Sequence, residues 1–383
     1  MTFSSTLISG LGARMNVIAS QAGKLDAFID FNSNGVFDAN ERVTPAGGLS
    51  LTAGENSFVV PVPDTTSPGQ KAARFRLSSA GGLSAKGTAV DGEVEDYIMN
   101  VVSPAEDTIQ LLPDPDSPGQ QLIYIRGTTG NDAISVEKTN LGFVVRMNNK
   151  VSPDLNANSR ILIYAGEGKD KISLPTSIPL PAIVDGGPGN DSLWGGNGND
   201  LLLGGNDDDE IYARGGLDTV YGGQGNDTII GDARTHVMFG EDGNDKITGH
   251  GILVGGKGQD TLRATGSRNI LIGGEGADQL TAAVGGDLLI GGTTNFDTNS
   301  TALKAILAEW SAAIAVNTRI AHLTGSQSGG LNGSFYLVSD AVRPGTVHND
   351  FAVDTVINTF AEDWLLLFSG DRRSSLAGIL NHS

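Results

Sequence analysis

The sequence predicts an all-β protein built around a parallel β-roll or β-helix solenoid. Three observations lead to this fold class. A nine-residue pattern repeats across residues 186–292, strand-like runs separated by turn residues fill the first hundred residues, and a single run with helical spacing follows the repeats. We therefore expect an N-terminal β-sandwich, then the solenoid, then a C-terminal α/β cap.

Changes of pattern along the chain set the expected domain boundaries, because each architecture has its own hydrophobic period. The prediction is a β-sandwich over 1–103, a linker over 104–120, an irregular β-helical start of the solenoid over 121–185, the repeats over 186–292, and a cap with one helix and short strands over 293–383.

The N-terminal segment contains five strand candidates bounded by Gly, Pro and Asp turns, and such strands pack most simply as a small sandwich. The candidates are residues 15–20, 25–31, 57–61, 72–78 and 97–102.

Residues 30–41, DFNSNGVFDANE, have the spacing of an EF-hand calcium loop. Gly35 permits the sharp turn that such a loop needs, and the preceding LDAFI alternates as a strand rather than a helix. We expect an EF-like loop on a β scaffold, and an acidic surface turn is the alternative. The expected calcium ligands are Asp30, Asn32, Asn34, Val36 through its carbonyl, Asp38 and Glu41.

With AARFRLSS at 72–79 and DGEVEDY at 91–97, this stretch resembles the GEVEDY domain over roughly residues 14–102. That domain is a β module of large bacterial surface or secreted proteins. Its acidic residues here leave two roles open, completing a calcium site or pairing with Arg74 and Arg76. They are Asp91, Glu93, Glu95 and Asp96.

Prolines and acidic residues alternate in SPAEDTIQLLPDPDSPGQ, which is typical of a linker. Strand-like runs resume at residue 121, and two isolated nine-residue frames follow, at 127–135 and 165–173. We therefore assign 121–185 to the start of the solenoid. Asp132 and Asp170 are weaker ligand candidates, because each lacks an adjacent matching frame.

The repeat itself is Gly-Gly-x-Gly-x-Asp-x-U-x, where U is aliphatic. The glycines allow a tight turn and a close approach of the backbone to an ion, and the Asp supplies a hard anionic oxygen. The last three residues form a short strand whose middle side chain points inward while its neighbours can face solvent. The predicted core ladder is Leu193, Leu202, Ile211, Val220, Ile229, Met238, Ile247, Leu262, Leu271, Leu280 and Leu289.

This motif resembles the RTX, or haemolysin-type, repeat family. The resemblance implies that two nonapeptides make one coil and that calcium ions lie between successive turns on one side, held by carboxylates and backbone carbonyls. A metal-free solenoid is the alternative. The implied ligands are Asp191, Asp200, Asp209, Asp218, Asp227, Asp245, Asp260, Asp278 and Asp287, with the turn glycines Gly186, Gly195, Gly204, Gly222 and Gly240.

Departures from the repeat predict two unequal columns of turns. Because alternate frames share a side, the column that contains Asp191 and Asp245 keeps its carboxylates in register. The other column loses its ligand at His236, and Asn269 replaces a further Asp. We expect more ions on the Asp191–Asp245 side, with His236 marking a decayed frame rather than a ligand.

After Gly292 the period stops, and residues 300–320 have apolar side chains mostly on one helical face. Asn299 or Ser300 can cap this helix, which we expect to cover the open end of the solenoid. The tail segments LNGSFYLV and DWLLLF are expected as strands. The ending resembles that of planctomycete RTX-like proteins, and this family resemblance implies a C-terminal signal for type I secretion.

Composition excludes several classes of function. A net charge of −19 argues against a nucleic-acid surface and suits a chain that meets a divalent cation. The chain has no cysteine, which excludes thiol catalysis and disulfides, and it has neither an apolar run that could span a membrane nor a visible cleavable signal. Zinc-protease, nucleophile-elbow and phosphate-loop motifs are missing, so we expect no enzyme.

Two functions fit these observations. The first is a calcium-binding structural or adhesive module of a secreted or cell-surface bacterial protein that folds on calcium outside the cell, with cell-surface or matrix components as candidate partners. The second is the noncatalytic C-terminal region of a larger secreted hydrolase. The chain start leads almost directly into strand-like sequence, so we expect either a piece of a longer protein or a mis-assigned start.

Overall fold

The computed structural model describes every residue except 1–6, 9–11, 52, 64–65, 68, 89–90, 103–104, 115–116, 118, 339–345, 359–362, 369–370, 376–379 and 382–383. The chain divides into two compact units. The first comprises Met1–Thr108 and Leu112–Gln121, and the second comprises Ile109–Leu111 and Leu122–Ser383.

The first unit is an all-β sandwich. One sheet has the order β1 (Leu7–Ile8), β7 (Glu93–Val102), β6 (Gly69–Ser78), β3 (Gly23–Ile29) and β4 (Leu49–Leu51), and β2 (Gly12–Ala19) pairs with β5 (Gly54–Pro61) as a second layer. Side chains from both layers, such as Val17, Leu25, Val60 and Phe75, share one core. Alternation along each strand explains this arrangement, because every second residue faces inward.

Charged residues on β6 resolve one alternative left open by the sequence. The Arg74 guanidinium donates to both carboxylate oxygens of Asp96, at 2.6 Å each. Arg76 instead donates to backbone carbonyls, those of Ser84 at 2.5 Å and Gly87 at 2.8 Å. The arginine pairing is therefore confirmed for Arg74, and Arg76 binds the backbone.

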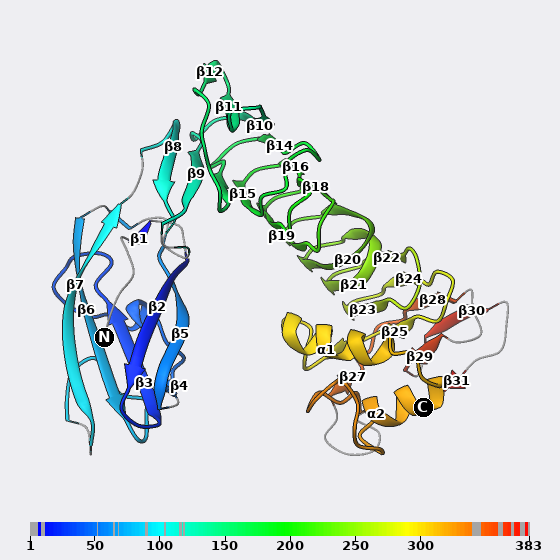
Figure 1. Ribbon diagram of the computed structural model, residues 1–383. Coiled ribbons are helices and arrows are strands. Elements are labelled where there is room, and N and C mark those ends of the chain that lie inside the picture. The colour runs from blue at the N-terminus through cyan, green and yellow to red at the C-terminus, as the bar shows by residue number, and fades with distance from the viewer. Residues whose placement is uncertain are drawn as a thin grey trace. The chain divides into compact units, whose positions relative to one another are not determined.

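The second unit is a β-solenoid of about seven turns over the repeat region, which confirms the predicted fold class. Apart from the strands over 143–147 and 150–151, which pair antiparallel, its strands stack in parallel register, two per coil, and form the long row of rungs in Figure 1. Inward residues such as Leu202, Val220 and Leu271 have no solvent exposure, as predicted for every member of the core ladder. The strands are β9 (Gln121–Arg126), β10 (Ala133–Lys138), β11 (Phe143–Met147), β12 (Lys150–Val151), β13 (Ile161–Tyr164), β14 (Lys171–Ser173), β15 (Ala182–Pro188), β16 (Ser192–Trp194), β17 (Leu201–Asn206), β18 (Glu210–Arg214), β19 (Thr219–Gln224), β20 (Thr228–Asp242), β21 (Lys246–Lys257), β22 (Thr261–Ala264), β23 (Ile270–Glu275), β24 (Gln279–Thr281) and β25 (Leu288–Ile290).

Two expectations about irregular segments need correction. The stretch 104–120, expected as a linker, contains the strand β8 (Thr108–Pro113). Its TIQLLP core is apolar enough to pair despite the surrounding prolines, which cannot donate backbone hydrogen bonds. Further on, LNGSFYLV forms turns and irregular structure rather than a strand, since Gly333 in the left-handed region (φ 60°) breaks the extended run.

The segment after the repeats contains two helices, where the sequence predicted one. These are α1 (Ser300–Trp310) and α2 (Val316–Leu323), and Asn299 caps α1 by accepting from the backbone N–H of Ala302. Strands β26 (Thr293–Thr294) and β27 (Val347–His348) pair at the base of this segment. Neither helix in the described ranges is long and apolar enough to cross a membrane.

We expected the helical segment to cover the open end of the solenoid. The helices instead pack against its side (Figure 1). Their buried residues Leu303, Ile306 and Trp310 pack on outward side chains of consecutive rungs, including Phe239 and Ile272. In frames such as VMF, ILV, ILI and LLI all three strand residues are apolar, so the outer face here is buried rather than solvent-exposed.

Beyond the helices the solenoid resumes. Strand β28 (Thr355–Asn358) pairs in parallel with β24, and β29 (Trp364–Leu366) pairs with β25. Strands β30 (Arg372–Ser375) and β31 (Leu380–Asn381) add to these two ladders. The helical segment is therefore an insertion within the solenoid, and not a terminal cap.

Candidate metal centre

The sixth-position aspartates form a continuous hydrogen-bonded ladder along one side of the solenoid. The backbone N–H of each Asp donates to the Oδ1 of the Asp one coil later, for example from Asp191 to Asp209 at 2.7 Å and from Asp209 to Asp227 at 2.8 Å. We call this ladder the first column. Its members are Asp132, Asp170, Asp191, Asp209, Asp227, Asp245, Asp260, Asp278, Asp354 and Asp371.

The second carboxylate oxygen, Oδ2, is left without a partner along most of this column. Burying an anionic oxygen with no donor costs free energy unless a cation or a proton satisfies it. A run of such atoms is therefore a place where bound cations or protons would be stabilised. The buried Oδ2 atoms without a hydrogen bond belong to Asp170, Asp191, Asp209, Asp227, Asp245, Asp260, Asp278 and Asp354.

In the first column, the first glycine of each frame from Gly186 to Gly273 creates a space into which two oxygens point. A Cβ at Gly204 would lie 2.3 Å from Asp209 Oδ2 and 2.4 Å from the carbonyl oxygen of Gly222 in the next coil. The same pair of oxygens surrounds Gly186, with 2.3 Å to Asp191 Oδ2 and 2.7 Å to the Gly204 carbonyl. We call this arrangement of glycine, carboxylate and carbonyl the cradle. Its hard oxygen donors fit calcium.

Burial raises the pKa of the first-column carboxyls, because the charged form loses its water. The pKa of Asp209, Asp245 and Asp278 rises to about 8, and neighbouring carboxylates add to the effect of burial. The pKa of Asp227 and Asp260 rises to about 6 for the same first reason. Without a cation, Asp209, Asp245 and Asp278 therefore hold protons at neutral pH, whereas Asp227 and Asp260 lose theirs near pH 6.

The second column offers fewer free oxygens. Asp200 Oδ2 accepts from the backbone N–H of Gly196 at 2.7 Å, and Asp287 Oδ2 accepts from that of Ala283 at 2.6 Å. Asp218 Oδ2 has no hydrogen bond of good geometry, but it lies 3.1 Å from His236 Nδ1. The second column thus has fewer unpaired carboxylate oxygens than the first, and the larger number of ions expected on the first column stays a prediction.

His236 occupies the ladder position of an aspartate. Its ring has no solvent exposure, and its Nε2 lies 3.0 Å from Asp232 Oδ1. Since Nδ1 faces Asp218, the imidazole lies between two carboxylates. The ring therefore takes the place beside Gly231 that an aspartate carboxylate has in a regular frame. At the next break, Asn269 keeps the ladder by accepting from Gly251 N–H at 2.8 Å and donating to Asp287 Oδ1 at 2.9 Å.

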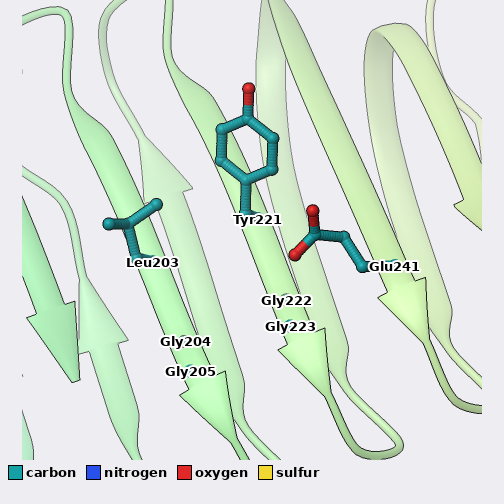
Figure 2. A pocket seen from close by; sticks show the side chains of 7 residues that line it. All are labelled: Leu203, Gly204, Gly205, Tyr221, Gly222, Gly223 and Glu241. Atoms are coloured by element: carbon teal, nitrogen blue, oxygen red, sulfur yellow. The ribbon is translucent and has the colours of Figure 1, made fainter. Parts of the chain in front are cut away.

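The turn glycines also shape the outer surface beside the first column. Figure 2 shows the pairs Gly204–Gly205 and Gly222–Gly223 in register below the side chains of Leu203 and Tyr221. Together with Glu241 they line a shallow pocket of about 340 Å³. Glu241 stands where a frame has its second glycine, and its φ of 80° is in the left-handed region that favours glycine.

The EF-like loop has its polar side chains turned inward. Asp30 accepts from the backbone N–H groups of Asn34 and Gly35 at 3.1 and 2.9 Å, and Glu41 accepts from those of Asn32 and Asp38 at 3.2 and 3.0 Å. Both carboxylates are buried, with exposures of 5% and 3%. Val36, whose carbonyl was an expected ligand, is 43% exposed and follows Gly35 at the turn.

In the described ranges, no three Asp, Glu or His side chains converge closely enough to hold a metal ion by themselves. The loop carboxylates of Asp30, Asp38 and Glu41 are therefore not gathered around one point. A calcium ion in either place must take part of its six to eight oxygens from backbone carbonyls and water, as the cradle geometry allows.

Sequence reasoning missed Asp354, Asp363 and Asp371. Asp278 N–H donates to Asp354 Oδ1 at 2.9 Å, and Asp287 N–H donates to Asp363 Oδ1 at 2.8 Å, so these residues continue both columns. The glycines that identify a frame do not precede them. The remaining signal was the run Asp-x-aliphatic in VDTVI and EDWLL, which matches positions six to eight.

Comparison with known families agrees with these observations. The GEVED domain model matches residues 24–100, and the model of the RTX calcium-binding nonapeptide repeat matches residues 183–211, 203–233, 237–251 and 252–293. No curated protein and no solved structure matches the chain. The chain therefore carries a GEVED domain followed by RTX calcium-binding nonapeptide repeats.

Proposed function

We propose that this chain is a calcium-dependent structural or adhesive module of a secreted or cell-surface bacterial protein. The observation that carries the proposal is the run of buried first-column Oδ2 atoms without a hydrogen-bond partner. GEVED domains and RTX repeats are generally non-catalytic, which favours binding over catalysis.

The first column explains how calcium would control folding. Without a cation, stacked carboxylates repel one another and must either take up protons or return to water, and both weaken the stacking of coils. Bound calcium supplies a positive charge shared by carboxylate and carbonyl oxygens of two coils. Extracellular modules bind calcium at roughly 10⁻⁴–10⁻³ M, so the chain would stay loose inside the cell and close outside it.

Isothermal titration of the full chain with calcium, with magnesium as the comparison, tests the proposal. We expect several calcium ions per chain and little competition from magnesium, which requires octahedral geometry and gives up water reluctantly. Absence of calcium binding at millimolar concentration would contradict the proposal. Binding of the calcium-loaded chain, but not of the chelated chain, to bacterial cells or glycans would support the adhesive role.

We also propose that the EF-like loop binds one calcium ion. Glu41 supports this, because its buried carboxylate closes the loop by accepting from the N–H groups of Asn32 and Asp38. Glu41→Gln should lower the calcium stoichiometry of the full chain by about one ion, since loops of this type depend on a bidentate Glu at that position. Glu137→Gln, at a side chain with 52% exposure, is the control and should leave it unchanged.

A further inference from the structure

One frame of the solenoid is split by the helical insertion. In a regular frame the first glycine precedes its aspartate by five positions, as Gly204 precedes Asp209, whereas Gly291 and Asp354 are 63 positions apart. The register nevertheless continues, because Asp278 N–H donates to Asp354 Oδ1 at 2.9 Å and β28 pairs with β24. Gly291 and Asp354 are thus two parts of one frame, separated by α1 and α2.

A complete cradle forms where the two parts meet. Asp354 has no solvent exposure, and its Oδ2 has no hydrogen-bond partner. That atom lies 2.4 Å from the position of a Cβ on Gly291, which matches the 2.3 Å between Asp209 Oδ2 and Gly204. Where the regular cradle has a backbone carbonyl, Asp371 Oδ2 lies 3.3 Å from the same point, and it also accepts from the backbone N–H of Phe368 at 2.7 Å. This cradle therefore brings the carboxylates of Asp354 and Asp371 to one point.

A further carboxylate lies on the adjoining turn. In regular coils the fourth-position glycine donates to a backbone carbonyl, as Gly258 N–H does to Glu275 at 2.7 Å. Gly276 N–H donates instead to Asp350 Oδ2 at 2.7 Å. Among the side chains that the structure describes, which exclude that of Arg373, no lysine or arginine forms an ion pair with Asp350, Asp354 or Asp371. The junction therefore concentrates negative charge around oxygen donors, which suits a hard divalent cation.

We propose that the cradle of Gly291, Asp354 and Asp371 binds a calcium ion that joins the two ends of the helical insertion to the solenoid. The proposal rests on the proposed calcium binding of the array and adds a site beyond the matched repeats. A calcium ion in this cradle would also make the docking of α1 and α2 dependent on calcium, because the site fixes the strands on which the helices pack.

Tryptophan positions make this docking measurable. The indole of Trp310 on α1 donates to the Gly286 carbonyl at 3.0 Å, and its ring lies 5.8 Å from that of Trp364 on β29. The third tryptophan, Trp194, stacks on Tyr212 in the repeats and would confuse the signal. In a Trp194→Phe background, which keeps an aromatic partner for Tyr212, tryptophan fluorescence reports on the insertion alone.

The test compares Asp354→Asn with Asp209→Asn in that background. Asparagine keeps the Oδ1 acceptor of the ladder, as Asn269 does naturally, but removes the charge. For Asp354→Asn we expect the fluorescence response to need about tenfold more calcium, since calcium affinity depends on the number of charged ligands. Calorimetric titration of this variant should count one calcium ion fewer. Far-UV circular dichroism should keep the unsubstituted midpoint. Asp209→Asn should shift the circular dichroism midpoint and leave the fluorescence response in place.

Each outcome has a distinct meaning. Equal fluorescence midpoints and equal ion counts for Asp354→Asn and its parent would overturn the inference while leaving the array intact. If Asp354→Asn does not fold at saturating calcium, Asp371→Asn, which alters the other carboxylate, must show the same tenfold shift, and an unshifted response rejects the site. A parent chain that gives neither a fluorescence nor a circular dichroism response to calcium refutes the proposed function itself.

Discussion

At the first glycine of a frame, the cradle has no room for a larger side chain. We expect Gly204→Ala to destabilise the calcium-bound protein by about 1–3 kcal/mol, as overpacking does in a rigid core, because the added Cβ meets Asp209 Oδ2 and the Gly222 carbonyl. Calcium-dependent thermal unfolding measures this loss. Gly47→Ala is the matched control, since no atom lies within 4 Å of its Cβ position, and an equal loss there would argue against the cradle.

His236 is the residue that interrupts the second column. His236→Asp should restore a carboxylate between the coils. Relative to the parent protein, the melting temperature of this variant should be higher in calcium and lower in chelator. An added site gives about 2.7 kcal/mol when calcium is 100 times its dissociation constant. Thermal melts in both buffers check this expectation. His236→Asn, which offers an acceptor without charge, should show no gain in calcium, and a gain there would mean that charge is not the cause.

At the scale of the element, the first column gives the metal-free protein an unusual dependence on pH. The pKa values of its carboxyls between Asp209 and Asp260, about 6 to 8 in the folded chain, are above the ordinary value of 3.8, so the folded state binds more protons than the unfolded state between these limits. This contribution to stability is fully present below pH 3.8 and is lost as pH rises through 6 to 8. Acid should thus partly replace calcium.

Thermal unfolding in calcium-free buffer checks this linkage. We expect a higher melting temperature at pH 5 than at pH 8 without calcium, and a smaller or reversed difference with millimolar calcium, since protons and calcium compete for the same oxygens. A metal-free melting temperature that rises from pH 5 to pH 8 would contradict the assignment of buried, protonated carboxyls.

At the scale of the elements, the sequence predicted the regular coils but not the position of the helical insertion. Strict periodicity located the inward residues from Leu193 to Leu289 and the register of Asp191 with Asp209, because each coil repeats the same contacts. It failed at Asp354, which is 63 positions from its glycine, Gly291, so that the two meet only in space. The lateral position of α1 was visible only indirectly, in strands such as ILV and ILI that are apolar on both faces.

For the whole molecule, the net charge of −19 makes the proposed calcium ions the expected cross-links of the solenoid, since the chain has no cysteine for disulfides. Each strand of a coil contributes one inward aliphatic side chain to its core, and residues such as Leu202 and Val220 stack in a single row. A repeat protein of this kind gains its stability from contacts between neighbouring coils. The buried carboxylates lie at those contacts, so their state should control the whole array.

Far-UV circular dichroism of the full chain, with calcium and with excess chelator at pH 8, tests the central claim most directly. The account predicts that chelated protein loses much of its β signal and its cooperative thermal transition, and that millimolar calcium restores both. Chelated protein that stays equally folded and melts at the same temperature would show that the aliphatic core alone holds the coils together, which contradicts the account.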